Sequence, residues 1–258
     1  MKIPKQLQDR IYWINPNLKL NEHANRISFI DLLVSDLDDT IAPCTAKEIV
    51  LEKIVKQPYN LFNPKMLDAC ASYIFNGFKD KAKSIAWQKY KRYFLNTNEE
   101  RSKISQKYTE EYAKSTLFPG FLDFLSLLPE NTVKIYLTGN ISEIIEGYIK
   151  ATGFNEAISD QFNKEKGIKK VTKRYPNKKR ILFSANDPED EAALDFLKYK
   201  KTKGEIEYVY SLYVTKSPNR INERYDINIA QIYTGLNELF RNVKNHPSKM
   251  DGILGEAL

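Results

Sequence analysis

The sequence is poor in cysteine and histidine and has no long hydrophobic run. Two cysteines, Cys44 and Cys70, are too few for a disulfide scaffold and are typical of a protein kept in a reducing compartment. The two histidines, His23 and His246, form no zinc-binding or catalytic-triad pattern. No stretch approaches the roughly 18 apolar residues of a transmembrane helix, and the N-terminal residues lack the apolar run of a secretory signal. We therefore expect a cytoplasmic protein without a membrane partner.

Basic residues, in contrast, are abundant. The 258 residues include 40 Lys and Arg against 33 Asp and Glu, a net charge of +7, and 42% of them are hydrophobic, enough to bury a sizeable core. A positive surface favours anionic partners such as phosphorylated metabolites or nucleic acid. Nine of the basic residues lie between Lys164 and Arg180, with Glu165 as the one acid. The simpler interpretation of that run is a solvated helix face, which is compatible with an anion site formed by one or two of its members.

Strand and helix signals alternate along most of the chain. Short β-type runs are expected at residues 29–35, 133–137, 181–184, 206–214 and 226–229, and amphipathic helices at 121–130, 141–153, 163–175, 189–199 and 232–243. This alternation predicts an α/β fold, a Rossmann-like three-layer core with a parallel sheet between helices. Near the N-terminus, Ile3, Leu7, Ile11 and Ile14 recur at helical spacing and predict a short packed helix.

A long helical stretch interrupts this pattern after the first strand. Residues 45–117 contain helical signals and no convincing strand, and the stretch is too long for a simple crossover. We therefore expect two domains, a core made of residues 1–44 and 118–258 and an inserted all-α cap made of residues 45–117. The cap span carries 14 Lys and Arg against eight Asp and Glu, which fits a phosphorylated ligand.

Polar residues follow the predicted strands at the edge where parallel sheets bind ligands. Asp36 and Asp38 follow the first strand, Thr138-Gly139-Asn140 the second, and Asp187 and Asp190 the third. Clustered carboxylates suit a hard divalent cation such as Mg²⁺, which binds oxygen ligands, water and substrate phosphate. A carboxylate beside such an ion can attack phosphorus, and a second one can transfer protons.

These residues stand in motifs that resemble those of the haloacid dehalogenase (HAD) superfamily. The segment D-L-D-D-T-I behind an apolar strand is similar to the family's first motif, and F-P-G-F-L-D-F-L with K-I-Y-L-T-G-N resembles its cap exit and second motif. A lysine-bearing helix followed by I-L-F-S-A-N-D-P-E-D-E-A-A resembles the third and fourth, and Y-D-I-N-I-A-Q-I-Y-T-G-L-N-E-L is similar to the closing strand and helix. The resemblance covers about residues 31–243. Four motifs in order are far more specific than the first alone.

The resemblance implies a role for each of these residues. Asp36 would be the nucleophile that becomes phosphorylated, and Asp38 the general acid and base, with its backbone carbonyl on Mg²⁺. The phosphoryl oxygens would be held by Thr138 and the backbone amides after it, at Gly139 and Asn140. A lysine of the basic helix, either Lys164 or Lys166, would neutralise the phosphoryl group; Lys164 is slightly favoured because Phe162-Asn163 before it indicates a helix start. Metal ligands would be Asp36, Asp38, Asp187 and Asp190. Within the superfamily, an acid at position 38 is typical of phosphate-transferring members.

The fourth motif departs from the family pattern, which is Gly-Asp followed four residues later by Asp. One register pairs Asn186 with Asp190 and places an amide where the first acid stands. The other keeps Asp187 as the acid and pairs it with Asp190 or Glu191. We favour Asp187 as the metal ligand and Asp190 behind it; the Asn186 register would predict weaker metal binding.

The sequence therefore predicts a Mg²⁺-dependent phosphatase, a phosphoric monoester hydrolase, that acts on a small phosphorylated metabolite through an aspartyl-phosphate intermediate. Two alternatives stay open. One is a catalytically weak or silent HAD-like binding or regulatory protein, motivated by Asn186. The other is a nucleic-acid-associated phosphatase, motivated by the net charge and by the basic run from Lys164 to Arg180. The sequence determines neither the substrate nor the oligomeric state.

Overall fold

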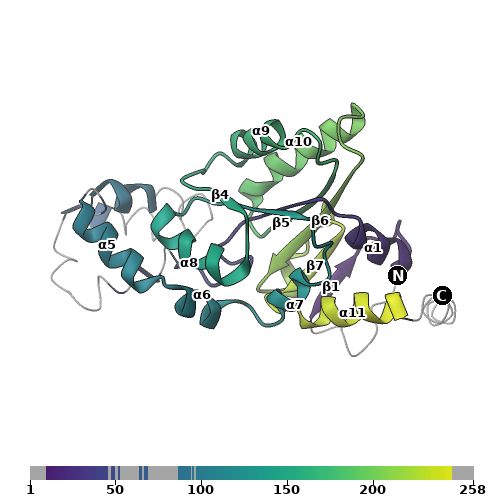
Figure 1. The fold of residues 1–258 in the computed structure, drawn as a ribbon, viewed down its shortest axis with the longest axis horizontal. Helices are drawn as coiled ribbons and strands as arrows, with labels where there is room; N and C mark the ends of the chain where they lie inside the picture. Colours follow the sequence, from purple (N-terminus) through teal and green to yellow (C-terminus); the bar gives the residue numbers. More distant parts are fainter. Residues whose placement is uncertain are drawn as a thin grey trace.

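A seven-stranded, mostly parallel sheet forms the centre of the molecule (Figure 1). The computed structural model describes residues 10–45, 48–49, 52, 64–65, 67–68, 87–93, 95 and 97–245. The strands lie in the order β1 (Ile11–Ile14), β7 (Ile227–Ala230), β6 (Tyr208–Thr215), β5 (Arg180–Ala185), β2 (Leu32–Ser35), β3 (Val133–Leu137) and β4 (Glu156–Ile158). All neighbouring pairs are parallel except β1 with β7 at one edge.

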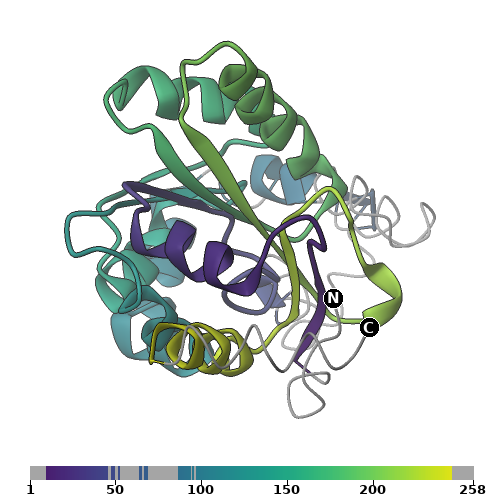
Figure 2. The same cartoon turned by 90° about the vertical axis from the view of Figure 1, so that its right-hand side faces the viewer.

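Helices cover both faces of this sheet. One face packs against α9 (Lys164–Arg174) and α10 (Glu191–Thr202), and the other against α1 (Leu20–Ser28), α7 (Phe121–Leu125), α8 (Ser142–Thr152) and α11 (Thr234–Asn245). Figure 2 shows the green pair α9 and α10 on one side of the sheet and the purple α1 and yellow α11 on the other. The side chains of β2 alternate between two cores, because successive residues of a strand point to opposite faces: Leu32 and Val34 face α9 and α10, and Leu33 faces the other layer.

The expected α/β fold is confirmed, and the five expected strands correspond to β2, β3, β5, β6 and β7 within a few residues. The predicted N-terminal helix is wrong where the structure describes it, because Ile11–Ile14 form β1 and pair with β7. Their spacing suits a helix, but pairing satisfies the backbone of the β7 edge and buries Ile11 and Ile14. The short strand β4 and helix α1 were not expected.

The expected helical insertion is described only in part. Helices α5 (Asn98–Lys107) and α6 (Glu110–Thr116) begin at the caps Thr97 and Thr109, whose side-chain oxygens accept hydrogen bonds from the backbone amides of Glu100 and Tyr112. Most of residues 46–96 lie outside the described residues, so the cap and its boundaries stay a prediction. Within the described ranges, no helix combines the length and apolar character needed to cross a lipid bilayer.

Helix α8 lies against the turn that joins α5 to α6, and Gly147 makes this close approach possible. A Cβ atom built at Gly147 would lie 2.1 Å from the backbone oxygen of Tyr108 and 2.8 Å from that of Thr109. Both atoms belong to backbone and cannot rotate away. Any side chain at position 147 would therefore push α5 and α6 away from α8.

We predict that Gly147→Ala lowers the free energy of unfolding by about 1–3 kcal/mol, the usual cost of overpacking. The direction of the change is diagnostic, because replacing glycine by alanine within a helix otherwise raises the free energy of unfolding by about 1 kcal/mol. Urea denaturation measures the change, and Glu146→Ala, on the exposed face of the same helix, is the control. A Gly147→Ala variant that is as stable as the unsubstituted protein, or more stable, would contradict the close contact.

Candidate functional site

The expected site residues converge where the order of the strands reverses. From β2 the chain proceeds to β3 and β4 on one side, then returns to β5, β6 and β7 on the other. Ligands of open α/β sheets bind at such a switch point, at the carboxyl ends of the strands. Asp36 follows β2 there, and its backbone amide donates to the Ser184 oxygen of β5 at 3.0 Å. The two strand ends are thus held together at the first motif.

The loop after β2 is fixed by bonds from the other end of the chain. Asp39 has a φ of 57°, a left-handed conformation that Asp tolerates better than most residues. Its backbone oxygen accepts from the Gln231 side chain at 2.9 Å, and the Thr40 oxygen accepts from the Tyr233 hydroxyl at 3.0 Å. The turn therefore depends on residues almost 200 positions away in the sequence.

A buried lysine joins two buried carboxylates at the centre of the site. The Lys164 ammonium lies 2.7 Å from Asp36 Oδ1 and 3.3 Å from Asp190 Oδ1, and it also donates to the Leu137 backbone oxygen at 2.7 Å. Lys164 is 8% exposed, Asp36 9% and Asp190 1%. Charges so far from water are stable only when paired and hydrogen-bonded. The first residue of α9 thus connects three strand ends, those of β2, β3 and β5.

The protonation of this group is set by burial and by mutual charge. Burial alone would lower the pKa of Lys164, but the charges of Asp190 and Asp36 and their hydrogen bonds outweigh it and raise that pKa, so Lys164 stays cationic. Burial raises the pKa of Asp190 to about 6, aided by repulsion from Asp36 and opposed by Lys164. One cation therefore balances two carboxylates that compete for it.

Asp38 is held by several donors on one of its two oxygens. Asp38 Oδ1 accepts from the Thr45 backbone amide at 3.1 Å, the Thr45 hydroxyl at 2.8 Å and the Asn140 side-chain amide at 3.0 Å. Burial and the nearby charge of Asp36 raise the pKa of Asp38, and these hydrogen bonds oppose the rise. The result is an oriented carboxyl group that holds a proton more readily than an exposed one.

The loop after β3 forms the second side of the site. Thr138 is 1% exposed, and its hydroxyl accepts from the Asn140 backbone amide at 3.2 Å. A Cβ atom at Gly139 would lie 2.7 Å from the ring of Phe162, so a side chain at position 139 would displace that ring. The Trp87 indole donates to the Gly139 backbone oxygen at 3.3 Å. The loop expected to bind phosphate is thus packed between Phe162 and Trp87.

The fourth motif brings Asp190, rather than Asp187, into contact with Lys164. Asp190 Oδ2 accepts from the backbone amides of Asn186 and Asp187 at 3.4 and 3.3 Å, while Asp187 is half-buried at the start of the 3-10 turn Pro188–Asp190. The amide oxygen of Asn186 is buried and has no hydrogen-bond partner among the residues that the structure describes. These placements match the register that pairs Asn186 with Asp190.

Within the described ranges, no group of three or more His, Cys, Asp or Glu side chains is arranged to hold a metal ion. A magnesium ion does not require such a group, because it commonly keeps waters and takes few protein ligands. The Asp36 carboxylate and the unsatisfied Asn186 oxygen offer oxygen atoms of the kind that Mg²⁺ prefers. The donor set therefore fits a weakly held hard cation.

Of the two candidate lysines, the structure brings only Lys164 into the site; Lys166 is exposed on the outer side of α9. Sequence reasoning missed Thr45, Trp87 and Phe162. The sequence carries no signal for Trp87 or Phe162, because their contacts join segments that lie far apart along the chain. Thr45 lies seven positions after Asp38, and only the return of the loop reveals the contact.

No family model matches the chain, and no curated protein sequence matches it.

We predict that Lys164→Met lowers the free energy of unfolding by about 3 kcal/mol at pH 7.5, because it leaves two buried carboxylates without their cation. The loss should shrink towards pH 5. Without Lys164 the pKa of Asp190 rises further above its unfolded value, so the native state binds more protons than the unfolded chain and stability falls as pH rises. Urea denaturation in EDTA at both pH values measures this.

Lys166→Met is the matched control, since the same change on an exposed side chain should cost under about 0.5 kcal/mol. Equal losses for the two variants, or a loss for Lys164→Met that does not depend on pH, would contradict the buried ion group.

Proposed function

We propose that this protein is a Mg²⁺-dependent phosphatase that hydrolyses a small phosphorylated metabolite through an aspartyl-phosphate intermediate on Asp36. The observation that carries the proposal is the 2.7 Å contact between the buried Lys164 ammonium and Asp36 at the carboxyl ends of the strands. The pairing places a fixed positive charge beside the carboxylate that would attack phosphorus. A buried ion pair adds little to the stability of a fold, because the cost of removing its charges from water offsets their attraction. A lysine beside a nucleophile, in contrast, can stabilise the negative charge of the phosphoryl group during transfer.

In the first step, an oxygen of Asp36 attacks phosphorus and the bond between phosphorus and the ester oxygen breaks. Asp38 gives its proton to the departing alcohol, and the raised pKa of Asp38 suits this role. In the second step, Asp38 removes a proton from water, whose oxygen attacks the phosphorus and releases phosphate from Asp36. The Thr138 hydroxyl and the backbone amides after it would hold the phosphoryl oxygens.

Mg²⁺ would be held by Asp36, the Asp38 backbone carbonyl and either the Asn186 amide oxygen or Asp187. It would supply positive charge that offsets repulsion between the acids of the site and an anionic substrate. Because an amide replaces a carboxylate in the Asn186 register, we expect a modest affinity for the ion.

In this proposal, a helical cap formed by residues 45–117 selects the substrate. Two of its residues support it: Trp87 donates to the Gly139 oxygen, and Lys91 pairs with Asp160 and lies 4.6 Å from the centre of the Phe162 ring. Both contacts lie at loops that follow β3 and β4. A cap in this position would exclude water from the reacting atoms. The low cysteine content keeps the cytoplasm as the proposed location.

A second candidate function is favoured by Asn186. A chain in which an amide stands at the metal position, and in which Lys164 already neutralises Asp36, can bind a phosphorylated ligand without turning it over. We therefore keep a catalytically silent binding protein as the alternative, which the next experiment separates from the enzyme.

We predict that Asp36→Asn abolishes hydrolysis of p-nitrophenyl phosphate, by a factor of about 10³ or more, because the amide cannot act as the nucleophile. Activity of the unsubstituted protein should require Mg²⁺ and be lost in EDTA. Asp123→Asn, on the exposed side of α7, is the matched control and should keep full activity.

Beryllofluoride with saturating Mg²⁺ should form an adduct on Asp36 that fluorine NMR detects. An adduct without turnover of any phosphoester would favour the binding protein. Turnover that survives in Asp36→Asn would exclude Asp36 as the nucleophile.

We predict that Thr45→Val moves the limb of the kcat–pH profile that Asp38 controls to higher pH by about half to one unit. The valine keeps the shape of threonine and removes one hydrogen bond to the charged form of Asp38, worth about 1 kcal/mol. Thr132→Val is the control, since its hydroxyl donates to the Ile30 backbone oxygen away from the site. A parallel shift in both variants would show a general effect of destabilisation instead.

A further inference from the structure

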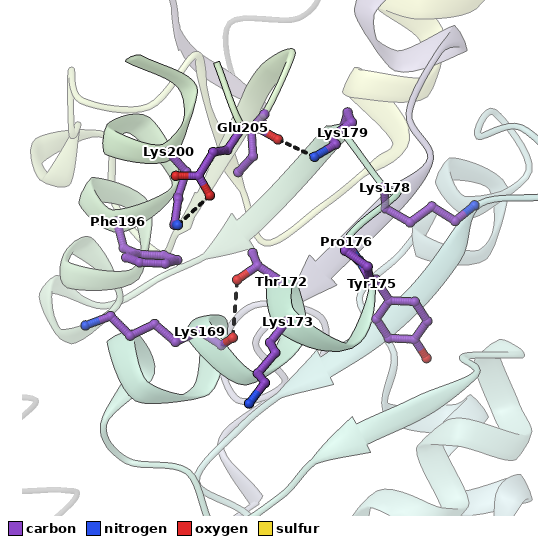
Figure 3. Close-up of a pocket in the computed structure, with 11 residues that line it drawn as sticks. Lys169, Thr172, Lys173, Tyr175, Pro176, Lys178, Lys179, Phe196, Lys200 and Glu205 are labelled. Carbon is purple, nitrogen blue, oxygen red and sulfur yellow. Dashed lines mark hydrogen bonds and ion pairs between the residues drawn. The ribbon is translucent and has the colours of Figure 1, made fainter. Parts of the chain in front are cut away.

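A cavity lies between the last turns of α9 and α10, away from the site described above. It has a volume of about 320 Å³, and five of the residues that line it are lysines: Lys169, Lys173, Lys178, Lys179 and Lys200. Figure 3 shows Lys169, Thr172 and Lys173 on one helix and Phe196 and Lys200 on the neighbouring one. The volume is at the lower end of the usual range for small-molecule pockets.

The cavity carries more positive charge than its surroundings neutralise. Its lining has five lysines and one acid, Glu205, a net charge of +4. Lys200 pairs with Glu205 at 2.6 Å, and Lys179 donates to the Glu205 backbone oxygen at 2.7 Å. Lys169 pairs with Glu165, which lies outside the lining, at 2.5 Å. This second acid removes one of the four charges, and the two helix ends contribute about half a negative charge each, which leaves roughly two positive charges. Stabilisation of helix ends alone does not require that excess.

An aromatic ring lies among these ammonium groups. Lys169 Nζ is 5.3 Å and Lys200 Nζ 5.6 Å from the centre of the half-buried Phe196 ring. Tyr175, Pro176 and Ile206 complete an apolar part of the lining. A ligand that combines a flat ring with phosphate groups would satisfy both parts of such a cavity, because the ring stacks on an aromatic side chain while lysines neutralise the phosphates.

The cavity is separate from the Asp36 site. Helix α9 begins with Lys164 in that site and runs 11 residues to Arg174, a length of about 16 Å at 1.5 Å per residue. The lining residues Lys178 and Lys179 precede β5, so the cavity lies near the amino ends of the strands, whereas Asp36 follows the carboxyl end of β2. A ligand could therefore occupy the cavity without blocking the other site.

We propose that this lysine-lined cavity binds nucleoside phosphates, with the base against Phe196 and the phosphates among Lys169, Lys173 and Lys200. Two sources offer that chemistry, a free nucleotide and a nucleotide unit of a single-stranded nucleic acid.

The proposal is tested by calorimetric titration of the protein with ADP and with pyrophosphate. The buffer contains EDTA, so that no magnesium-dependent turnover occurs. Saturable binding of ADP is expected. Lys173→Glu should weaken ADP binding about tenfold, since it removes one favourable charge and adds an unfavourable one. Phe196→Leu should weaken ADP binding about fivefold or more through lost stacking and leave pyrophosphate binding unchanged.

Lys150→Glu is the matched control, because Lys150 is an exposed lysine in the last turn of another helix, α8. Asp36→Asn should leave ADP affinity unchanged, so failure of the phosphatase proposal does not affect this one. A labelled ten-nucleotide oligothymidylate distinguishes the sources: tighter binding than ADP with a steep salt dependence identifies nucleic acid, and weaker binding identifies the free nucleotide. Absence of saturable ADP binding, equal losses in Lys173→Glu and Lys150→Glu, or a loss in Asp36→Asn would overturn the proposal.

Discussion

The buried contact of Lys164 with Asp36 and Asp190 is the interaction on which the candidate site depends. Three charged groups are removed from water at one point, and each is tolerable only because the others are present. The lysine begins α9, Asp36 follows β2 and Asp190 follows β5, so the contact also fixes how a helix meets two strands. Loss of any one member would affect both the stability and the chemistry of this edge of the sheet.

The arrangement around this centre separates two carboxylates that stand two residues apart in the sequence. Asp36 contacts the Lys164 ammonium, whereas Asp38 is held by Thr45 and Asn140 and has a raised pKa. The identical side chains thus have different partners, one a cation and the other neutral hydrogen-bond donors, as the nucleophile and the proton donor of the proposed mechanism require. The division of roles in the proposed mechanism follows from that difference.

Helix α9 has a further role in the molecule, because its two ends lie in different electrostatic environments. Its first residue is buried between acids, and its last turn borders a cavity that holds an excess of lysines. The basic run from Lys164 to Arg180 is therefore more than one solvated face: Lys164 belongs to the first site, Lys173 and Lys178 line the cavity, and Lys166 is exposed. The geometry of α9, and of β5 after it, places these similar residues in different surroundings.

The sequence by itself determined the alternation of strands and helices, and hence the parallel sheet and the edge at which Asp36, Asp38, Thr138 and Asp190 meet, because hydrophobic periodicity and strand ends are local properties. It did not determine that Ile11–Ile14 form a strand, since the partner edge β7 lies more than 200 residues away. Neither could it show that Lys164, and not Lys166, lies among the buried acids, or that Asp190, and not Asp187, contacts that lysine. These contacts depend on which side chain the packed helix turns inward and on which carboxylate reaches a buried ammonium, and only the tertiary structure determines them.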